Sequence, residues 1–156
     1  MSFSGNSRLI IVCGLPGSGK TTFARQLEER LHAVRLSADD WMEALAVNLW
    51  DEQSRARIES LQWTVAQRLL RQGLVVIIEW GTWARSERDA LRIRARELGA
   101  AVELRYVKAP IDVLFERVQQ RRLEDPPMTR EQLIRWSEIF AEPTEDEMAL
   151  YDKPAE

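Results

Sequence analysis

The chain has 156 residues and a net charge of −3, with 22 lysines and arginines against 25 aspartates and glutamates. This length suits one domain with a real core, over residues 1–156, and leaves no room for a second full domain. The weakly negative charge argues against general nucleic-acid binding. The single cysteine excludes a disulfide within the chain, and no apolar run approaches membrane-spanning length. We therefore expect a cytoplasmic protein without a membrane partner; the sequence does not indicate its oligomeric state.

The most informative stretch lies near the N-terminus. A β-prone run over residues 9–13 leads into Gly14-Leu15-Pro16-Gly17-Ser18-Gly19-Lys20-Thr21, and residues 22–31 then have helical spacing of apolar side chains. The stretch fits the phosphate-binding pattern G-x-x-x-x-G-K-[ST]. Glycines let the backbone wrap an anion, and the helix N-terminus attracts it. A chance match in an ordinary turn is the alternative, which the flanking strand and helix disfavour.

This loop predicts binding of a nucleoside triphosphate. Lys20 can reach the β- and γ-phosphates, and the Thr21 hydroxyl can ligate Mg²⁺. The remaining residues expected to hold the nucleotide are Gly14, Pro16, Gly17, Ser18, Gly19 and Thr22.

Two helices are predicted after a short second strand over residues 34–36. The first runs to about residue 49, and its expected cap is Ser37, Asp39 or Asp40. The second runs over about 54–72. The predicted apolar stripe of the first is Met42, Leu45 and Leu49, and that of the second is Ile58, Leu61, Val65 and Leu69.

Residues 74–78 form the most hydrophobic run and predict a central parallel strand covered on both faces. It ends at Glu79. Burying an unpaired carboxylate costs several kcal/mol, so we favour a site role for Glu79, at the magnesium ion or its water, or against the acceptor.

The second half continues the alternation of strands and helices. We predict a helix over about 86–98, a strand over 102–107, a helix opened by Pro110, and a last helix from a capping box at 129–132 to about residue 140. The tail from residue 142 is acidic and has no clear fifth strand. The pattern predicts a three-layer α/β/α fold with a four- to five-stranded parallel sheet, whose ligand lies at the carboxyl ends of the strands.

Residues 12–22, the run Leu36-Ser37-Ala38-Asp39-Asp40-Trp41 and the arginine-rich helix after Pro110 resemble small phosphate-loop kinases. The group contains chloramphenicol phosphotransferase, the zeta-toxin sugar-nucleotide kinases and polynucleotide 5′-kinase. The resemblance covers nearly the whole chain, although only the phosphate loop is specific by itself. It implies ATP–Mg²⁺-dependent transfer of the γ-phosphoryl to a hydroxyl, an acceptor-activating aspartate at Asp39, and a mobile arginine-bearing lid at about residues 117–129.

Polynucleotide kinases of this group carry an arginine that contacts nucleic acid two residues after the second acid. Met42 stands at that place here. A nucleic-acid partner is therefore less expected than a small hydroxyl acceptor.

Each further candidate has a plainer alternative. Asp39 comes close to the phosphate loop if the second strand lies near the first, but Asp39 and Asp40 could also merely cap a helix. Asp40 is the second choice for the base. Arg121 is expected on the phosphates and Arg117 on the adenine, although both could form a solvated face paired with acidic neighbours.

Arginines and tryptophans near the strand ends are the candidate acceptor contacts. Arg85 and Arg88 could hold the acceptor or form surface salt bridges. Trp41, Trp80 and Trp83 suit a ring-containing molecule, with core packing as the alternative. Trp63 and Trp136 are interpreted as packing residues.

The sequence thus favours an ATP-dependent kinase of a small hydroxyl acceptor such as an antibiotic, a sugar or a nucleoside-like compound. The alternatives are a polynucleotide 5′-hydroxyl kinase and a nucleotide-binding module with slow ATP hydrolysis. The length disfavours motor and transporter ATPases, and no N-K-x-D motif supports a GTP switch.

Overall fold

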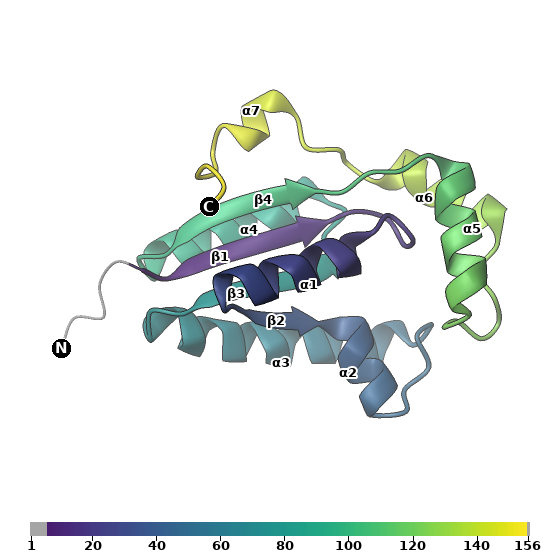
Figure 1. Ribbon diagram of the computed structural model, residues 1–156, viewed down its shortest axis with the longest axis horizontal. Coiled ribbons are helices and arrows are strands. Elements are labelled where there is room, and N and C mark those ends of the chain that lie inside the picture. The colour runs from purple at the N-terminus through teal and green to yellow at the C-terminus, as the bar shows by residue number, and fades with distance from the viewer. Residues whose placement is uncertain (1–5, 156) are drawn as a thin grey trace.

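The computed structural model describes residues 6–155. Its sheet has four parallel strands, β1 (Arg8–Cys13), β2 (Val34–Ser37), β3 (Val75–Gly81) and β4 (Ala101–Tyr106), in the order β2-β3-β1-β4 (Figure 1). The most hydrophobic run is confirmed as a central strand, because β3 pairs with both β1 and β2. The second strand is not next to the first, as β3 lies between them.

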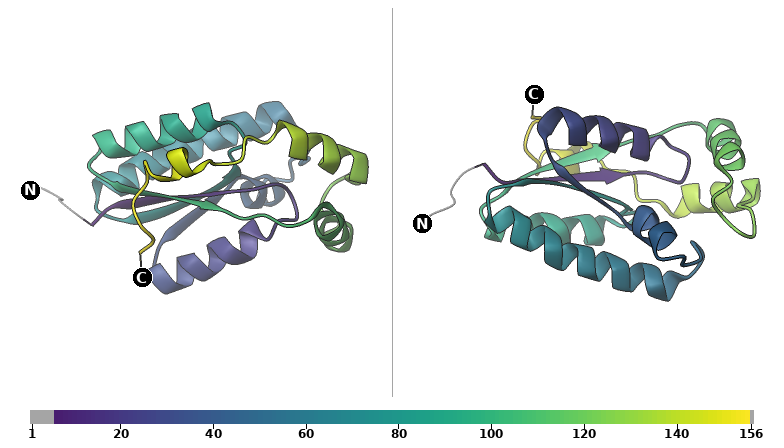
Figure 2. Two further views of the ribbon diagram at one scale, coloured as in Figure 1. Left: turned by 90° about the horizontal axis from the view of Figure 1, so that it is seen from above. Right: turned by 60° about the horizontal axis from the view of Figure 1, so that its bottom comes forward.

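Helices cover both faces of this sheet (Figure 2). Helix α1 (Lys20–Leu31) lies on one face, and α3 (Glu52–Arg71) and α4 (Arg85–Glu97) lie on the other. Successive side chains along each strand point to opposite faces of the sheet. Ile10 and Ile77 therefore belong to the cluster under α1, while Ile11 and Ile78 pack with the residues of α3 and α4. The predicted three-layer α/β/α class is confirmed.

The remaining helices gather mostly beyond the carboxyl ends of the strands. Helix α2 (Ala38–Ala44) is shorter than predicted, and Leu45 is 63% exposed rather than part of its buried stripe. Helices α5 (Ile111–Arg121) and α6 (Arg130–Ile139) lie together past the strand ends, and α6 has the predicted capping box (Figure 1). The short α7 (Glu145–Met148) in the acidic tail was not predicted. Between residues 6 and 155, no helix combines the length and apolarity needed to cross a membrane.

Candidate functional site

The phosphate loop joins β1 to α1, as the sequence predicts. Gly17 has a φ of 80°, and a Cβ atom there would lie 2.6 Å from the carbonyl oxygen of Leu114 in α5. Only glycine fits a left-handed residue so close to another backbone. The Lys20 ammonium donates to the Leu15 carbonyl oxygen at 3.3 Å. Burial lowers the pKa of Lys20, against the opposing effect of the nearby Glu79 and Asp39 carboxylates.

The end of β3 directs two candidate site residues, Glu79 and Trp80, to opposite faces of the sheet. Glu79 points to the α1 side, where its carboxylate accepts a hydrogen bond of 2.7 Å from the Thr21 hydroxyl. Trp80 points to the α3 side, where its indole N–H donates to Gln62 at 2.6 Å. This division follows from the period of two along a strand.

The contact between Thr21 and Glu79 tests the expected magnesium site. A hydroxyl and a carboxylate lie together at the start of α1, and both are the hard oxygen ligands that Mg²⁺ prefers. The other Glu79 oxygen accepts from Arg35 at 2.9 Å. The residues therefore fit the ion, with Glu79 held in place by the partly buried Arg35. Among residues 6–155, no cluster of three or more His, Cys, Asp or Glu side chains forms an all-protein metal cage.

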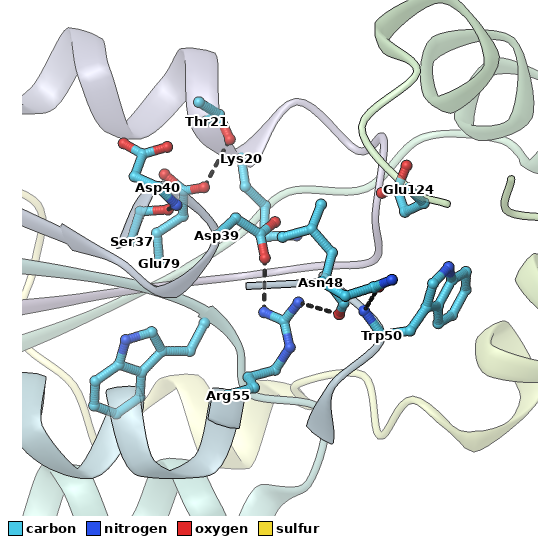
Figure 3. Close-up of polar contacts among 12 residues, drawn as sticks. Lys20, Thr21, Ser37, Asp39, Asp40, Asn48, Trp50, Arg55, Glu79 and Glu124 are labelled. Atoms are coloured by element: carbon cyan, nitrogen blue, oxygen red, sulfur yellow. Dashed lines mark hydrogen bonds and ion pairs between the residues drawn. The ribbon is translucent and has the colours of Figure 1, made fainter. Parts of the chain in front are cut away.

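The adjacent aspartates after β2 point in different directions (Figure 3). Asp40 pairs with Arg35 on the α1 side and does not line the large cavity. Asp39 lines that cavity and accepts from Arg55 at 2.7 Å. The cap of α2 is Ser37, whose hydroxyl accepts from the Asp40 N–H at 3.3 Å. Asp39 is therefore not the helix cap.

The cavity itself has a volume of about 510 Å³ and contains both Lys20 and Asp39. Its wall is rich in indole rings, and the lining side chains come from segments spread over the chain from Pro16 to Trp136. The tryptophans that line it are Trp50, Trp80, Trp83 and Trp136. The ring centroid of Trp136 lies 6.0 Å from that of Trp50 and 5.7 Å from that of Trp83, so these three form a continuous aromatic wall.

The predicted lid region contributes one of its two candidate arginines to the cavity. Arg121 lines it and pairs with Glu124, which also lines it. Arg117 lies outside the cavity, where it donates to the Gly17 carbonyl oxygen at 3.1 Å. Arg117 thus contacts the phosphate loop itself, and Arg121 lines the cavity that the loop residues Pro16 and Lys20 also line.

The loop over residues 122–129 is docked onto the segment that follows α2. The Asn48 side-chain amide donates to the Asp125 carbonyl oxygen at 3.1 Å, and the Trp50 indole N–H donates to that of Pro126 at 2.7 Å. We call these two contacts the lid latch. They bring the loop against the cavity at its Glu124 and Met128 side.

Besides Asp40, three expected acceptor contacts do not line the cavity: Trp41, Arg85 and Arg88. Trp41 packs between two core clusters, and Arg85 lies at the start of α4 with its guanidinium 3.5 Å from Asp89. Arg88 is fully buried. It donates to Glu147 twice and to the carbonyl oxygens of the loop and tail residues Thr82, Trp83 and Ala141.

The expectation for Arg88 is therefore wrong for a physical reason. Its five N–H groups are all engaged by protein acceptors, and a guanidinium has no more to offer. Its carboxylate partner Glu147 comes from α7, 59 residues further along the chain.

Several cavity residues were not identified from the sequence, among them Trp50, Glu52, Arg55, Glu59 and Glu87. Glu59 faces the cavity from the middle of α3, one turn after Arg55. Burial, reinforced by the negative charges of Glu87 and Glu52, raises the pKa of Glu59 to about 7, although Arg55 opposes the shift. The sequence pattern that could have indicated Arg55 and Glu59 is their i, i+4 spacing, which places both side chains on one face of the helix. Trp136, interpreted as a packing residue, also lines the cavity.

Comparisons with known proteins agree with this geometry. A shikimate kinase from Brucella canis is 27% identical over 121 residues, and the match covers 74% of this chain but only 58% of the relative. A chain of the Pnkp1/Rnl/Hen1 RNA repair complex has a TM-score of 0.70 at 22% identity, covering 94% of this chain and 46% of that one. A gluconokinase from Sinorhizobium meliloti has a TM-score of 0.61 at 21% identity, covering 95% and 81%.

The two structural likenesses show the fold, a phosphate-loop kinase fold of parallel strands and covering helices. The family model described as an AAA domain matches residues 9–143. Since this match includes the phosphate loop, all four strands and the lid region, the chain belongs to the AAA_33 family of phosphate-loop kinases.

Proposed function

We propose that this protein is an ATP-dependent kinase that phosphorylates a hydroxyl group of a small, ring-containing acceptor. The observation that carries the proposal is that Asp39, Lys20 and Arg121 line one cavity together with four tryptophans. The first three are the groups that a phosphoryl transfer to an alcohol uses, and the tryptophans offer flat surfaces to a ring.

In the proposed reaction the acceptor oxygen forms a bond to the γ-phosphorus, and the bond from that phosphorus to the β,γ-bridging oxygen breaks. ADP leaves with the electron pair of that bond, and the acceptor proton passes to the Asp39 carboxylate. Arg55 holds Asp39 at 2.7 Å and so orients the base. Lys20 and Arg121 offset the charge on the transferring group.

Thr21 and Glu79 are the residues that would hold Mg²⁺. The bound ion supplies charge neutralisation on the phosphate oxygens. Because Arg35 and Thr21 both contact Glu79, the carboxylate is already directed at the start of α1. The same Arg35 engages Asp40, so this arginine joins the second acid to the metal side rather than to the acceptor.

Two features disfavour the polynucleotide alternative. Met42, at the place of the expected nucleic-acid contact, is fully buried in α2. The cavity is also lined by six carboxyl groups and only three cationic side chains, which is unfavourable for a phosphodiester backbone.

The test is a transfer assay with ATP labelled on the γ-phosphoryl, over neutral, cationic and anionic alcohols, nucleosides and 5′-hydroxyl oligonucleotides. We expect a small alcohol to be labelled, and Asp39→Asn to lower transfer by roughly 10²–10⁴-fold while ATP binding persists. Asp89→Asn, a surface aspartate of α4, is the matched control and should keep full activity. Labelling of the oligonucleotide alone, or full transfer in Asp39→Asn, would overturn the proposal.

A further inference from the structure

The carboxyl groups in the cavity fall into two sets. Three of them have a cationic partner: Asp39 has Arg55, Glu79 has Arg35, and Glu124 has Arg121. The other three, Glu52, Glu59 and Glu87, make no ion pair with any residue between 6 and 155 and form what we call the acidic trio. The cavity thus holds negative charge that the described part of the chain leaves unneutralised.

The acidic trio is close enough for its charges to interact. Glu87 and Glu52 both raise the pKa of Glu59, as does Asp39 from α2, and Arg55 is the cation that opposes them. Glu52 and Glu87 lie in the first turns of α3 and α4, where they also favour the helix dipoles. Glu59 is mid-helix and half-buried, so the dipole gives it no such stabilisation. Arg55, already paired with Asp39, stabilises a carboxylate at that position in part, and a cation that enters the cavity would stabilise it further.

The aromatic wall lies in the same cavity and suits the same kind of ligand. Trp50, Trp83 and Trp136 form adjacent indole faces. Indole is the ring that attracts a cation most strongly, and its flat face also packs on the C–H face of a sugar ring. Arg55 cannot recognise an anionic acceptor freely, because its two terminal nitrogens donate to Asp39 and to the Leu49 carbonyl oxygen.

We infer that the acceptor is a cationic polyol, an amino sugar or amino cyclitol whose hydroxyl meets Asp39 and whose ammonium group meets the acidic trio and the tryptophan wall. This inference rests on the proposed function. Arg55 contacts Asp39, and Glu59 lies one helical turn further, about 6 Å along the axis of α3. A hydroxyl and an ammonium group on one or two linked rings span distances of this order, and Asp39 and Glu59 line the same cavity. The ammonium group keeps its proton throughout, and only the hydroxyl oxygen gains the phosphoryl group.

The test compares ligands that differ in charge. Glucosamine, a two-ring aminoglycoside core such as neamine, their N-acetylated counterparts and gluconate are assayed for labelled transfer. Binding is measured separately by calorimetry with a non-hydrolysable ATP analogue present. We expect at least one amine to bind and react tenfold or more better than its N-acetylated form, with gluconate the poorest. In Glu59→Gln this preference should fall at least tenfold through KM, while kcat changes little. Glu97→Gln, an exposed glutamate of α4, is the matched control.

A pH series adds a readout that a merely structural role would not give. The amine affinity of the wild type divided by that of Glu59→Gln at the same pH should rise between pH 6 and 8 as Glu59 ionises, since its pKa is about 7, with Asp39, Arg55, Glu52 and Glu87 as the charged groups facing it. The ratio cancels the ligand's own loss of protons, which is common to both proteins, and a constant ratio would contradict the role of Glu59.

The outcomes separate the two proposals. Transfer to neutral or anionic alcohols without preference for amines would overturn this inference and keep the kinase. Amine binding that depends on Glu59, without transfer to any alcohol, would support the cationic ligand and overturn the kinase. Absence of both binding and transfer for every compound would overturn both.

Discussion

The buried ion pair between Arg88 and Glu147 gives the sharpest stability prediction. The Arg88 Nε and Nη2 atoms donate to Glu147 at 2.7 and 2.9 Å, and the two side chains are 0% and 1% exposed. Glu147→Gln keeps the shape but removes the charge, so it leaves the Arg88 guanidinium buried without a counter-ion. Breaking such a pair costs about 3–5 kcal/mol, a large fraction of the 5–15 kcal/mol typical of a domain.

The measurement is urea unfolding, with thermal unfolding as a second readout. In a chain of this size, each kcal/mol of lost stability lowers the thermal unfolding midpoint by about 2–4 °C. The thermal midpoint of Glu147→Gln should therefore fall by roughly 10 °C. Glu97→Gln makes the same chemical change at a glutamate that is 58% exposed and paired with Arg94, so it should cost at most about 1 kcal/mol. A Glu147→Gln protein as stable as the Glu97→Gln control would refute the reasoning and return Arg88 to the list of candidate ligand contacts.

Three further predictions concern the site. Lys20→Ala removes charge-assisted hydrogen bonds of roughly 1.5–3 kcal/mol, so ATP affinity or turnover should fall at least tenfold, and unchanged turnover in a folded variant would contradict the assignment. Hydrogen exchange over residues 117–129 should slow when a non-hydrolysable ATP analogue binds, whereas equal protection with and without it would argue against a lid. The pKa of Glu59 is raised from 4.5 to about 7, so the stabilisation from its extra bound proton is complete below pH 4.5 and lost as the pH rises through 7. Urea unfolding at pH 5 and 8 should therefore show about 1–3 kcal/mol more loss of stability in the wild type than in Glu59→Gln, and equal losses would place the Glu59 pKa near its usual value.

Local patterns in the sequence predicted the elements well. The phosphate loop, the central strand β3 and the capping box of α6 each depend on residues within a short window, and all three are present. Such features need no knowledge of distant partners, because turn geometry and capping are decided by neighbours in the chain.

The buried face of α3 includes Ile58 as predicted, but the positions after it were predicted one residue out of phase. Leu61 is 55% exposed, while the buried positions are Ile58, Gln62, Ala66 and Leu70. Apolarity was misleading because the polar Gln62 is buried, where its amide donates to the Ser37 carbonyl oxygen and its oxygen accepts from Trp80. Polar groups are buried when such partners satisfy them, and these partners lie far away in the sequence.

The same limit applies to the site. Asp39 and Glu79 could be predicted because each lies near the carboxyl end of a strand, and these strand ends meet at one edge of the sheet. Trp50 and Trp136 reach the cavity only because the segment after α2 and helix α6 pack together beyond that edge. This contact between the segment after α2 and helix α6 is determined by tertiary packing, so no local sequence pattern predicts it.

The lid latch has a consequence for how the acceptor preference can be changed. Asn48 and Trp50 hold the loop by the main-chain carbonyl oxygens of Asp125 and Pro126, not by its side chains. A main-chain carbonyl oxygen accepts hydrogen bonds whatever side chain the residue carries. The side chain of Glu124, which lines the cavity, can therefore be exchanged to suit a different phosphoryl acceptor while the docking bonds are kept. Closure and selectivity become separable engineering variables, and substitutions of the Glu124 side chain would vary selectivity without removing the bonds that hold the loop.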